Sequence, residues 1–168
     1  MRPILKQIIQ YAILLAWLPL LNGCDEEDDV VEIFTGKVWK LNRLNIEGNS
    51  GQFLALWNTE QAYNQSMTAL RTEGNYTIEF TAPDANVAGG DFTARGIRAT
   101  VTGQWNADGK SHTISITAAK VSGNETDPLA KEFVSGLQKL SSYEGDSRTL
   151  TLKYAEGQNN KIMGLMAQ

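Results

Sequence analysis

Short segments in which apolar and polar residues alternate recur along this 168-residue chain. Residues 75–80 read NYTIEF, so that Tyr76, Ile78 and Phe80 share one face of an extended strand. Successive side chains of a strand point to opposite faces of a sheet. The alternation therefore predicts a strand that buries one face and exposes the other.

Further segments that favour strands occur at residues 37–46, 91–105, 111–119, 150–154 and 161–166. The pair Asp108-Gly109 is typical of a β-hairpin turn, and it lies between two of these segments. Gly96 and Gly103 fall inside the segment 91–105, which we interpret as one long strand with bulges or bends at these glycines.

Two segments carry helical signals. Thr59 is a favoured N-cap, and apolar residues follow at spacings of four and three up to about Arg71. Asp127 and Pro128 suit the N-cap and the first position of a second helix, whose apolar stripe consists of Leu129, Phe133, Leu137 and Leu140. The order of these elements predicts an α+β fold: a strongly curved antiparallel sheet or small β-barrel with two helices packed on one side or end.

The first 23 residues have the pattern of a secretion signal. Arg2 and Lys6 precede an apolar run at residues 8–21, which is shorter than the roughly 20 residues of a membrane-spanning helix. Leu21-Asn22-Gly23 then lead into Cys24, the only cysteine. This segment resembles a bacterial lipoprotein signal with a lipobox, in which the thiol of Cys24 is lipidated. The alternative is a buried structural cysteine after an amphipathic helix.

The resemblance implies cleavage before Cys24 and attachment of the mature chain to the outer membrane through lipid. One acyl chain binds a bilayer with an association constant of only about 10⁴ M⁻¹, whereas lipoproteins of this type carry two or three chains. We therefore expect a lipoprotein signal peptide at residues 1–23, an acidic tether at residues 24–35, and a single domain at residues 36–168.

Five acidic residues follow the cysteine directly: Asp25, Glu26, Glu27, Asp28 and Asp29. A run of like charges is expected to stay solvated, and an anionic membrane repels it, so the simplest interpretation is a solvated tether. The run also resembles the export signal of surface-exposed lipoproteins in certain Gram-negative bacteria, which implies that the protein faces the cell exterior. Retention facing the periplasm is the alternative, since an aspartate after the cysteine can mean inner-membrane retention in other lineages.

Three segments are similar to META-type and small lipocalin-like bacterial domains. GKVWKL at residues 36–41 resembles their opening strand, NYTIEF a central strand, and residues 129–152 the closing helix, turn and strand. These are packing positions, so the resemblance implies the fold and envelope association but no functional residue. The Gly-Cys-Asn turn of many META domains has no counterpart here, because Cys24 is the only cysteine.

The composition argues against several kinds of site. One cysteine and one histidine, His112, exclude a disulfide framework, a multi-cysteine metal site and a histidine-rich one. The net charge is −4 and the basic residues are scattered, so we expect no nucleic-acid partner.

Catalytic motifs are also missing from the sequence. Ser111 and His112 are neighbours on a predicted strand, so their side chains point apart and cannot form a nucleophile–base pair. Glu125 and Asp127 are candidates for an acid–base pair, but Asp127 is better explained as a helix cap. We therefore predict a protein that is not an enzyme and that uses no cofactor and no metal.

Of the three tryptophans after Cys24, Trp39 and Trp105 lie in predicted strands and are expected to fill the core. Trp57 lies beside polar residues, and with Tyr63 it would form an exposed aromatic patch suited to a sugar or a protein.

We expect a non-enzymatic binding or interaction module that takes a small apolar or sugar-like ligand in the cup of its sheet, or a protein partner at its edge. The alternatives are a structural or accessory protein within a larger envelope complex, and a hydrolase with an unrecognised site. A lined cavity would favour the ligand binder, and a filled barrel with an exposed apolar patch the accessory protein. Titratable groups converging in one cleft would favour the enzyme.

Overall fold

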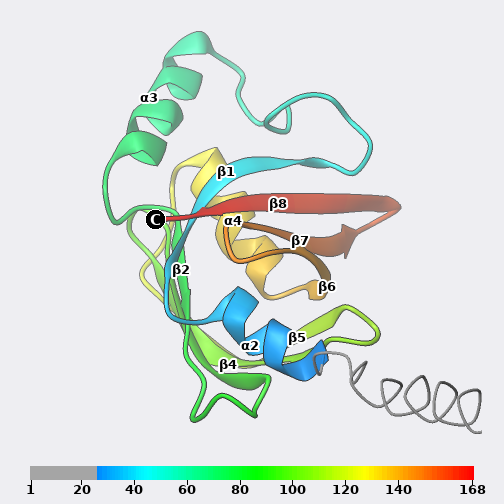
Figure 1. Ribbon diagram of the computed structural model, residues 1–168. Coiled ribbons are helices and arrows are strands. Elements are labelled where there is room, and N and C mark those ends of the chain that lie inside the picture. The colour runs from blue at the N-terminus through cyan, green and yellow to red at the C-terminus, as the bar shows by residue number, and fades with distance from the viewer. Residues whose placement is uncertain (1–25) are drawn as a thin grey trace, which may run out of the picture.

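The computed structural model describes residues 26–168, in which antiparallel strands close into a barrel in chain order (Figure 1). The strands are β1 (Val38–Ile46), β2 (Thr77–Phe80), β3 (Gly89–Arg95), β4 (Thr100–Asp108), β5 (Thr113–Ser122), β6 (Leu140–Gly145), β7 (Thr149–Glu156) and β8 (Asn159–Ala167). The helices of this part of the chain are α2 (Glu26–Phe34), α3 (Glu60–Arg71) and α4 (Pro128–Leu137). None of these helices has the length and apolar character needed to cross a membrane.

The predicted small barrel is confirmed, but the balance of elements differs from the prediction. The fold is mostly sheet, closed by the pairing of β8 with β1, and it has three described helices where the sequence predicts two. The predicted N-caps of α3 and α4 are confirmed, because the side chains of Thr59 and Asp127 accept hydrogen bonds from the backbone N–H groups of Ala62 and Ala130.

Helix α2 is the element that the sequence pattern does not predict. It contains the acidic residues Glu26–Asp29, which a charge argument assigns to a solvated tether. The helix forms because the residues that follow can bury an apolar side: Val30, Val31 and Phe34 have helical spacing, and all three are buried. Acidic residue types are also favoured in the first turn of a helix, where the helix dipole is positive. The tether expected at residues 24–35 is therefore wrong for residues 30–34, which belong to the folded unit.

Two predicted boundaries are also wrong. Residues 91–105 are not one strand but the end of β3, a turn at residues 96–99, and the start of β4. Gly103, by contrast, lies at the irregularity in the β4–β5 pairing, as predicted. The second helix ends at Leu137 rather than at Leu140, which begins β6.

Helices close both ends of the barrel. At one end Phe34 of α2 stacks on Trp105, with ring centroids 4.9 Å apart, and contacts Phe80 edge to face. At the other end α4 buries one side almost completely, and Gly136 lies so close to β7 and β8 that a Cβ there would be 2.2 Å from the Cε of Met163. The predicted core positions of Trp39 and Trp105 are confirmed, and the interior of the described barrel is one continuous cluster of buried side chains.

Strand β2 connects the two ends. Its last residue, Phe80, contacts Phe34 of α2, whereas Tyr76, just before its start, contacts Phe133 of α4. Helix α3 lies at this second end, where Ser66 bonds to Asp127, the cap of α4. We call the two ends the α2 end and the α3 end; Figure 1 shows α2 near the bottom of the view and α3 at the top.

Candidate functional site

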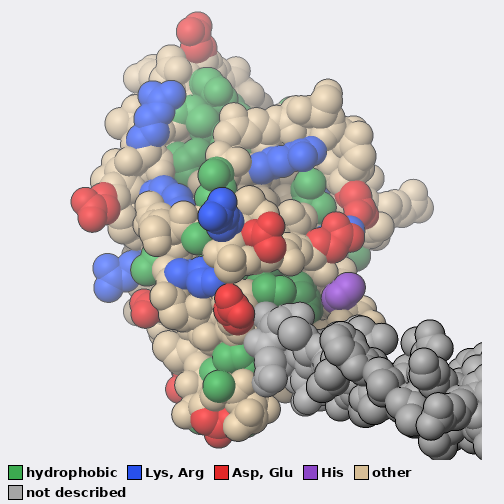
Figure 2. Space-filling view, viewed as in Figure 1, with side chains coloured by type: hydrophobic (Ala, Val, Ile, Leu, Met, Phe, Trp, Pro, Cys, Tyr) green, Lys and Arg blue, Asp and Glu red, His purple; other side chains and the backbone are tan. Residues whose placement is uncertain are grey.

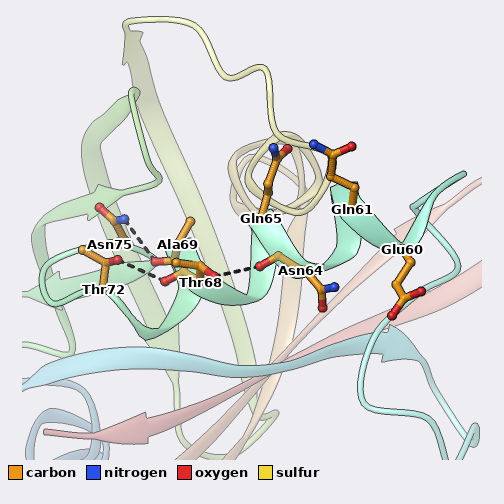
Figure 3. Close-up of a pocket in the computed structure, with 8 residues that line it drawn as sticks. All are labelled: Glu60, Gln61, Asn64, Gln65, Thr68, Ala69, Thr72 and Asn75. Atoms are coloured by element: carbon orange, nitrogen blue, oxygen red, sulfur yellow. Dashed lines mark hydrogen bonds between the residues drawn. The ribbon is translucent and has the colours of Figure 1, made fainter.

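Helix α3 presents a polar face to solvent. Only Ser66 and Met67 of this helix are buried, because the helix rests on the barrel along one narrow side. An open hollow of about 640 Å³ runs along its outer side (Figure 3) and is lined by Glu60, Gln61, Asn64, Gln65, Thr68, Ala69, Thr72 and Asn75. The lining has one carboxylate and no basic residue.

Some of these polar groups are already used within the helix. The hydroxyl of Thr68 donates to the carbonyl of Asn64 at 2.9 Å, and the hydroxyl of Thr72 donates to the carbonyl of Thr68 at 3.0 Å. Within the described part of the chain, the side-chain amides of Gln61, Asn64 and Gln65 have no hydrogen-bond partner, and those of Gln61 and Gln65 point to the same side in Figure 3. Each amide offers two donors and one acceptor, which suits a neutral ligand rich in hydroxyl or amide groups.

A chain of hydrogen bonds connects α3 to the barrel. The indole N–H of Trp57 donates to Oγ of Ser66 at 2.6 Å, and Ser66 donates to Oδ2 of Asp127 at 2.5 Å. The hydroxyl of Tyr76 donates to the other oxygen of Asp127 at 2.9 Å. Burial and the negative charge of Asp127 raise the pKa of Tyr76 well above its usual range, so this hydroxyl stays a donor. The carboxylate of Asp127, the N-cap of α4, thus links α3 to the barrel.

The two aromatic residues singled out in the sequence are in contact: Tyr63 belongs to the first turn of α3, and Trp57 lies just before the helix. The rings of Trp57 and Tyr63 are 5.1 Å apart and perpendicular, and Phe53 meets Trp57 at the same angle. Trp57 is half-buried and Tyr63 is 41% exposed. Trp57 therefore packs against Phe53 and against Tyr63 at the start of α3, and Tyr63 is the more exposed of the two residues that the sequence singled out.

The two carboxylates considered for acid–base work have other partners. Oε1 of Glu125 accepts hydrogen bonds from the backbone N–H groups of Ile97, Arg98 and Ala99 at 2.7, 2.8 and 2.8 Å. Asp127 is bonded as described above. Both groups therefore act as acceptors that hold turns and helices in place.

His112 lies in the β4–β5 turn rather than on a strand, with φ of 52°. Its ring is 5.7 Å from that of Tyr143, while the hydroxyl of the neighbouring Ser111 bonds to that of Thr113. Serine and histidine are not brought together. Among the described residues there is also no group of three or more side chains suited to a metal ion.

One ionic cluster was not anticipated from the sequence. Glu132 of α4 accepts hydrogen bonds from the hydroxyl of Tyr154 and from Nζ of Lys161, both at 2.7 Å. Lys161 and Lys139 also pair with Glu156, and these hydrogen bonds lower the pKa of Glu156 to about 2. The register of the β7–β8 hairpin, which pairs Tyr154 with Lys161, is the one signal that could have indicated part of it.

The expected lipidation residue Cys24 and the first residue of the expected export signal, Asp25, lie outside the described residues. Glu26, Glu27, Asp28 and Asp29 form the beginning of α2.

Comparison with known proteins identifies a family and a fold. A family model described as "Domain of unknown function (DUF4847)" matches residues 25–167. A crystal structure of a DUF4847 family protein from Bacteroides vulgatus ATCC 8482 is similar, with a TM-score of 0.61 and 24% sequence identity. The match covers 82% of this chain and 96% of that one. No curated protein matches this chain.

Proposed function

Because the chain belongs to the DUF4847 family, whose description assigns no function, we propose a role from its own sequence and geometry. The protein is a lipid-anchored module of the bacterial outer membrane that faces the exterior. It binds a partner through its outer surface and does not catalyse a reaction.

The leader sequence supports the anchor. A short apolar run, a small residue and the lone Cys24 occur in the order that lipidation requires, and an acidic run follows. Mass spectrometry of the native protein tests this directly: we expect a chain that begins at an acylated Cys24. An intact leader or an unmodified thiol would exclude the anchor, and proteolysis of intact cells tests which side of the membrane the domain faces.

Because the interior of the barrel is filled, we place the proposed binding site on the outer surface. The interior is occupied by large side chains, among them Trp39, Tyr76 and Phe92, so the cup expected for a small ligand is closed. The observation that carries the proposal is the α3 face, where three neighbouring amides have no partner within the described chain. Such groups suit a sugar or a protein backbone.

Photo-crosslinking in intact cells tests the α3 face. A photoreactive residue at Gln65 should form crosslinks to one partner, and the further changes Gln61→Ala and Asn64→Ala should reduce them. Both residues are exposed, and alanine favours helix, so the fold should survive. A photoreactive residue at Gln104, exposed on β4, is the matched control. Equal crosslinking at both positions, insensitive to the alanine changes, would exclude the α3 face.

A second role is favoured by the same filled interior: a structural or accessory protein within a larger envelope complex. The large exposed apolar residues among those described are Tyr63, Val87, Val121 and Met166, which lie on four different segments. Purification in mild detergent distinguishes the two roles, because an accessory protein would co-elute with a stable complex. A hydrolase ranks last, since Glu125 and Asp127 already have structural partners.

A further inference from the structure

The position of α2 determines how much free chain lies between the proposed anchor and the barrel. Helix α2 begins at Glu26, two residues after Cys24. A tether through residue 35 would contain 12 residues and could span about 40 Å, whereas two residues span about 7 Å at most. If α2 is docked, the anchor therefore lies close to the end of the barrel that α2 closes.

Contacts along α2 show that it is docked. Phe34 is fully buried among aromatic rings of three strands, and its carbonyl accepts a hydrogen bond from the indole N–H of Trp39 at 3.0 Å. Nζ of Lys37 donates to the carbonyl of Glu32 at 2.7 Å, and Thr35 forms a bridge with Phe80 of β2. Val30 is also buried. The helix is thus part of the barrel end and not a swinging linker.

We propose that the α2 end of the barrel faces the lipid surface and that the α3 end is held away from it. This inference rests on the proposed lipid anchor at Cys24. The β4–β5 turn lies on the membrane side, because Gly109 and His112 line a hollow together with Val30 and Ile33 of α2. The exposed face of α3 lies at the opposite end, where an external partner can reach it.

The anchor and not charge sets this orientation. The α2 end carries the acidic residues Glu26–Asp29 at the start of the helix, which an anionic bilayer repels. Figure 2 shows acidic and basic side chains interspersed on the visible face of the described residues rather than gathered into a basic patch. The protein without its lipid should therefore not bind to vesicles of phosphatidylethanolamine and phosphatidylglycerol. Stable binding of the unlipidated protein to these vesicles would overturn the proposal.

Fluorescence quenching tests the orientation. The lipidated protein is labelled with a fluorophore at Lys110→Cys in the β4–β5 turn or at Thr68→Cys on α3, both exposed positions. It is then placed in the same vesicles with a nitroxide quencher on the lipid headgroups. We expect the label at position 110 to lose most of its emission and the label at position 68 to keep it. Equal quenching of the two labels would overturn the proposal.

A linker variant and a second form of attachment separate this inference from the anchor itself. A flexible glycine–serine linker of the length of the expected tether, inserted between Asp25 and Glu26, should reduce quenching at position 110 to the level at position 68; unchanged quenching there would contradict the role of the short connection. If Cys24 proves to be unacylated, a histidine tag placed directly before Asp25 attaches the protein to nickel-chelating vesicles. The difference between positions 110 and 68 should remain in that form, and its loss would overturn the orientation alone.

Discussion

The carboxylate of Glu125 organises the turn between β3 and β4. It accepts hydrogen bonds from three consecutive backbone N–H groups, those of Ile97, Arg98 and Ala99. These residues precede Glu125 by 26 to 28 positions. A Cβ on Gly96 would lie 2.2 Å from its Oε1. Glycine is therefore required at position 96 by the close approach of this carboxylate.

Gly96→Ala is expected to destabilise the protein by about 3 kcal/mol, because the buried carboxylate would be displaced from its backbone donors. Urea-induced unfolding followed by tryptophan fluorescence measures this. Gly157→Ala is the control: nothing lies within 4 Å of its Cβ position, so it should lose only about 1 kcal/mol for its left-handed backbone. Equal losses in the two variants would contradict the role of Glu125.

Glu156 makes stability depend on pH in the acid range. Hydrogen bonds from Lys139 and Lys161 lower its folded-state pKa to about 2, below the unfolded value of about 4.3. The ion pairs therefore stabilise the folded state above the unfolded pKa, and this contribution is lost as the pH falls from about 4.3 towards 2.

We expect the free energy of unfolding to fall less steeply over that interval in Glu156→Gln than in the parent protein. The side chain of Glu156 is 38% exposed, so added salt should reduce the difference between the two proteins. Glu60→Gln is the control, since no ion pair of the described residues includes Glu60. Parallel pH curves for Glu156→Gln and the parent would disprove the coupling.

Helix α3 is joined to α4 through the buried hydroxyl of Ser66. The hydroxyl of Ser66 accepts a hydrogen bond from the indole N–H of Trp57 and donates one to Asp127, so it joins α3 to the N-cap of α4. Ser66→Ala should cost about 2 kcal/mol, because the indole N–H of Trp57 and the carboxylate of Asp127 lose a partner in a part-buried site. It should also increase hydrogen exchange in α3 before the barrel is affected.

Thr68→Ala is the control for this prediction, because Thr68 is exposed and bonds only to a carbonyl of its own helix. The two variants should therefore differ both in stability and in the exchange of α3. If Thr68→Ala and Ser66→Ala behaved alike, the link between α3 and α4 would not carry the stability of the helix.

The barrel as a unit is closed at both ends and filled. We therefore expect no saturable binding of fatty acids to the parent protein in calorimetric titrations.

Phe92→Ala should lose about 4 kcal/mol of stability. It should also gain binding of benzene, seen as a rise of its melting temperature, since an apolar cavity of this kind stays dry. An apolar ligand that stabilised the parent protein would show that the interior is open to ligands.

The two ends of the barrel carry different elements, so in the proposed orientation one end lies near the membrane and the other lies away from it. The α2 end carries a helix that begins two residues after the proposed anchor Cys24, and the α3 end carries amides that have no hydrogen-bond partner among the described residues. The resemblance to META-type and lipocalin-like domains stays a prediction, because the comparisons support the DUF4847 family and its fold.

Local physical chemistry was sufficient for much of this protein. The alternation in residues 75–80 predicted that Tyr76, Ile78 and Phe80 are buried, and all three are. Tyr76 nevertheless lies just before β2, with a φ of 52°, rather than on the strand. The N-caps at Thr59 and Asp127 could also be predicted from local sequence, because an N-cap side chain accepts a hydrogen bond from an N–H group only three positions away. Composition also argued against a disulfide framework, since the sequence has one cysteine, whereas the absence of a nucleic-acid partner stays a prediction.

Contacts between distant segments decided the rest. The turn at residues 96–99 is held by Glu125, which comes after β4 and β5 in the sequence, so no local signal indicates this turn. Helix α2 forms because a barrel end offers aromatic rings to Phe34, which outweighs the charge run at its start. The open face of α3 is likewise a result of how one narrow side of the helix meets α4. Such features depend on burial against partners that only the closed barrel brings together.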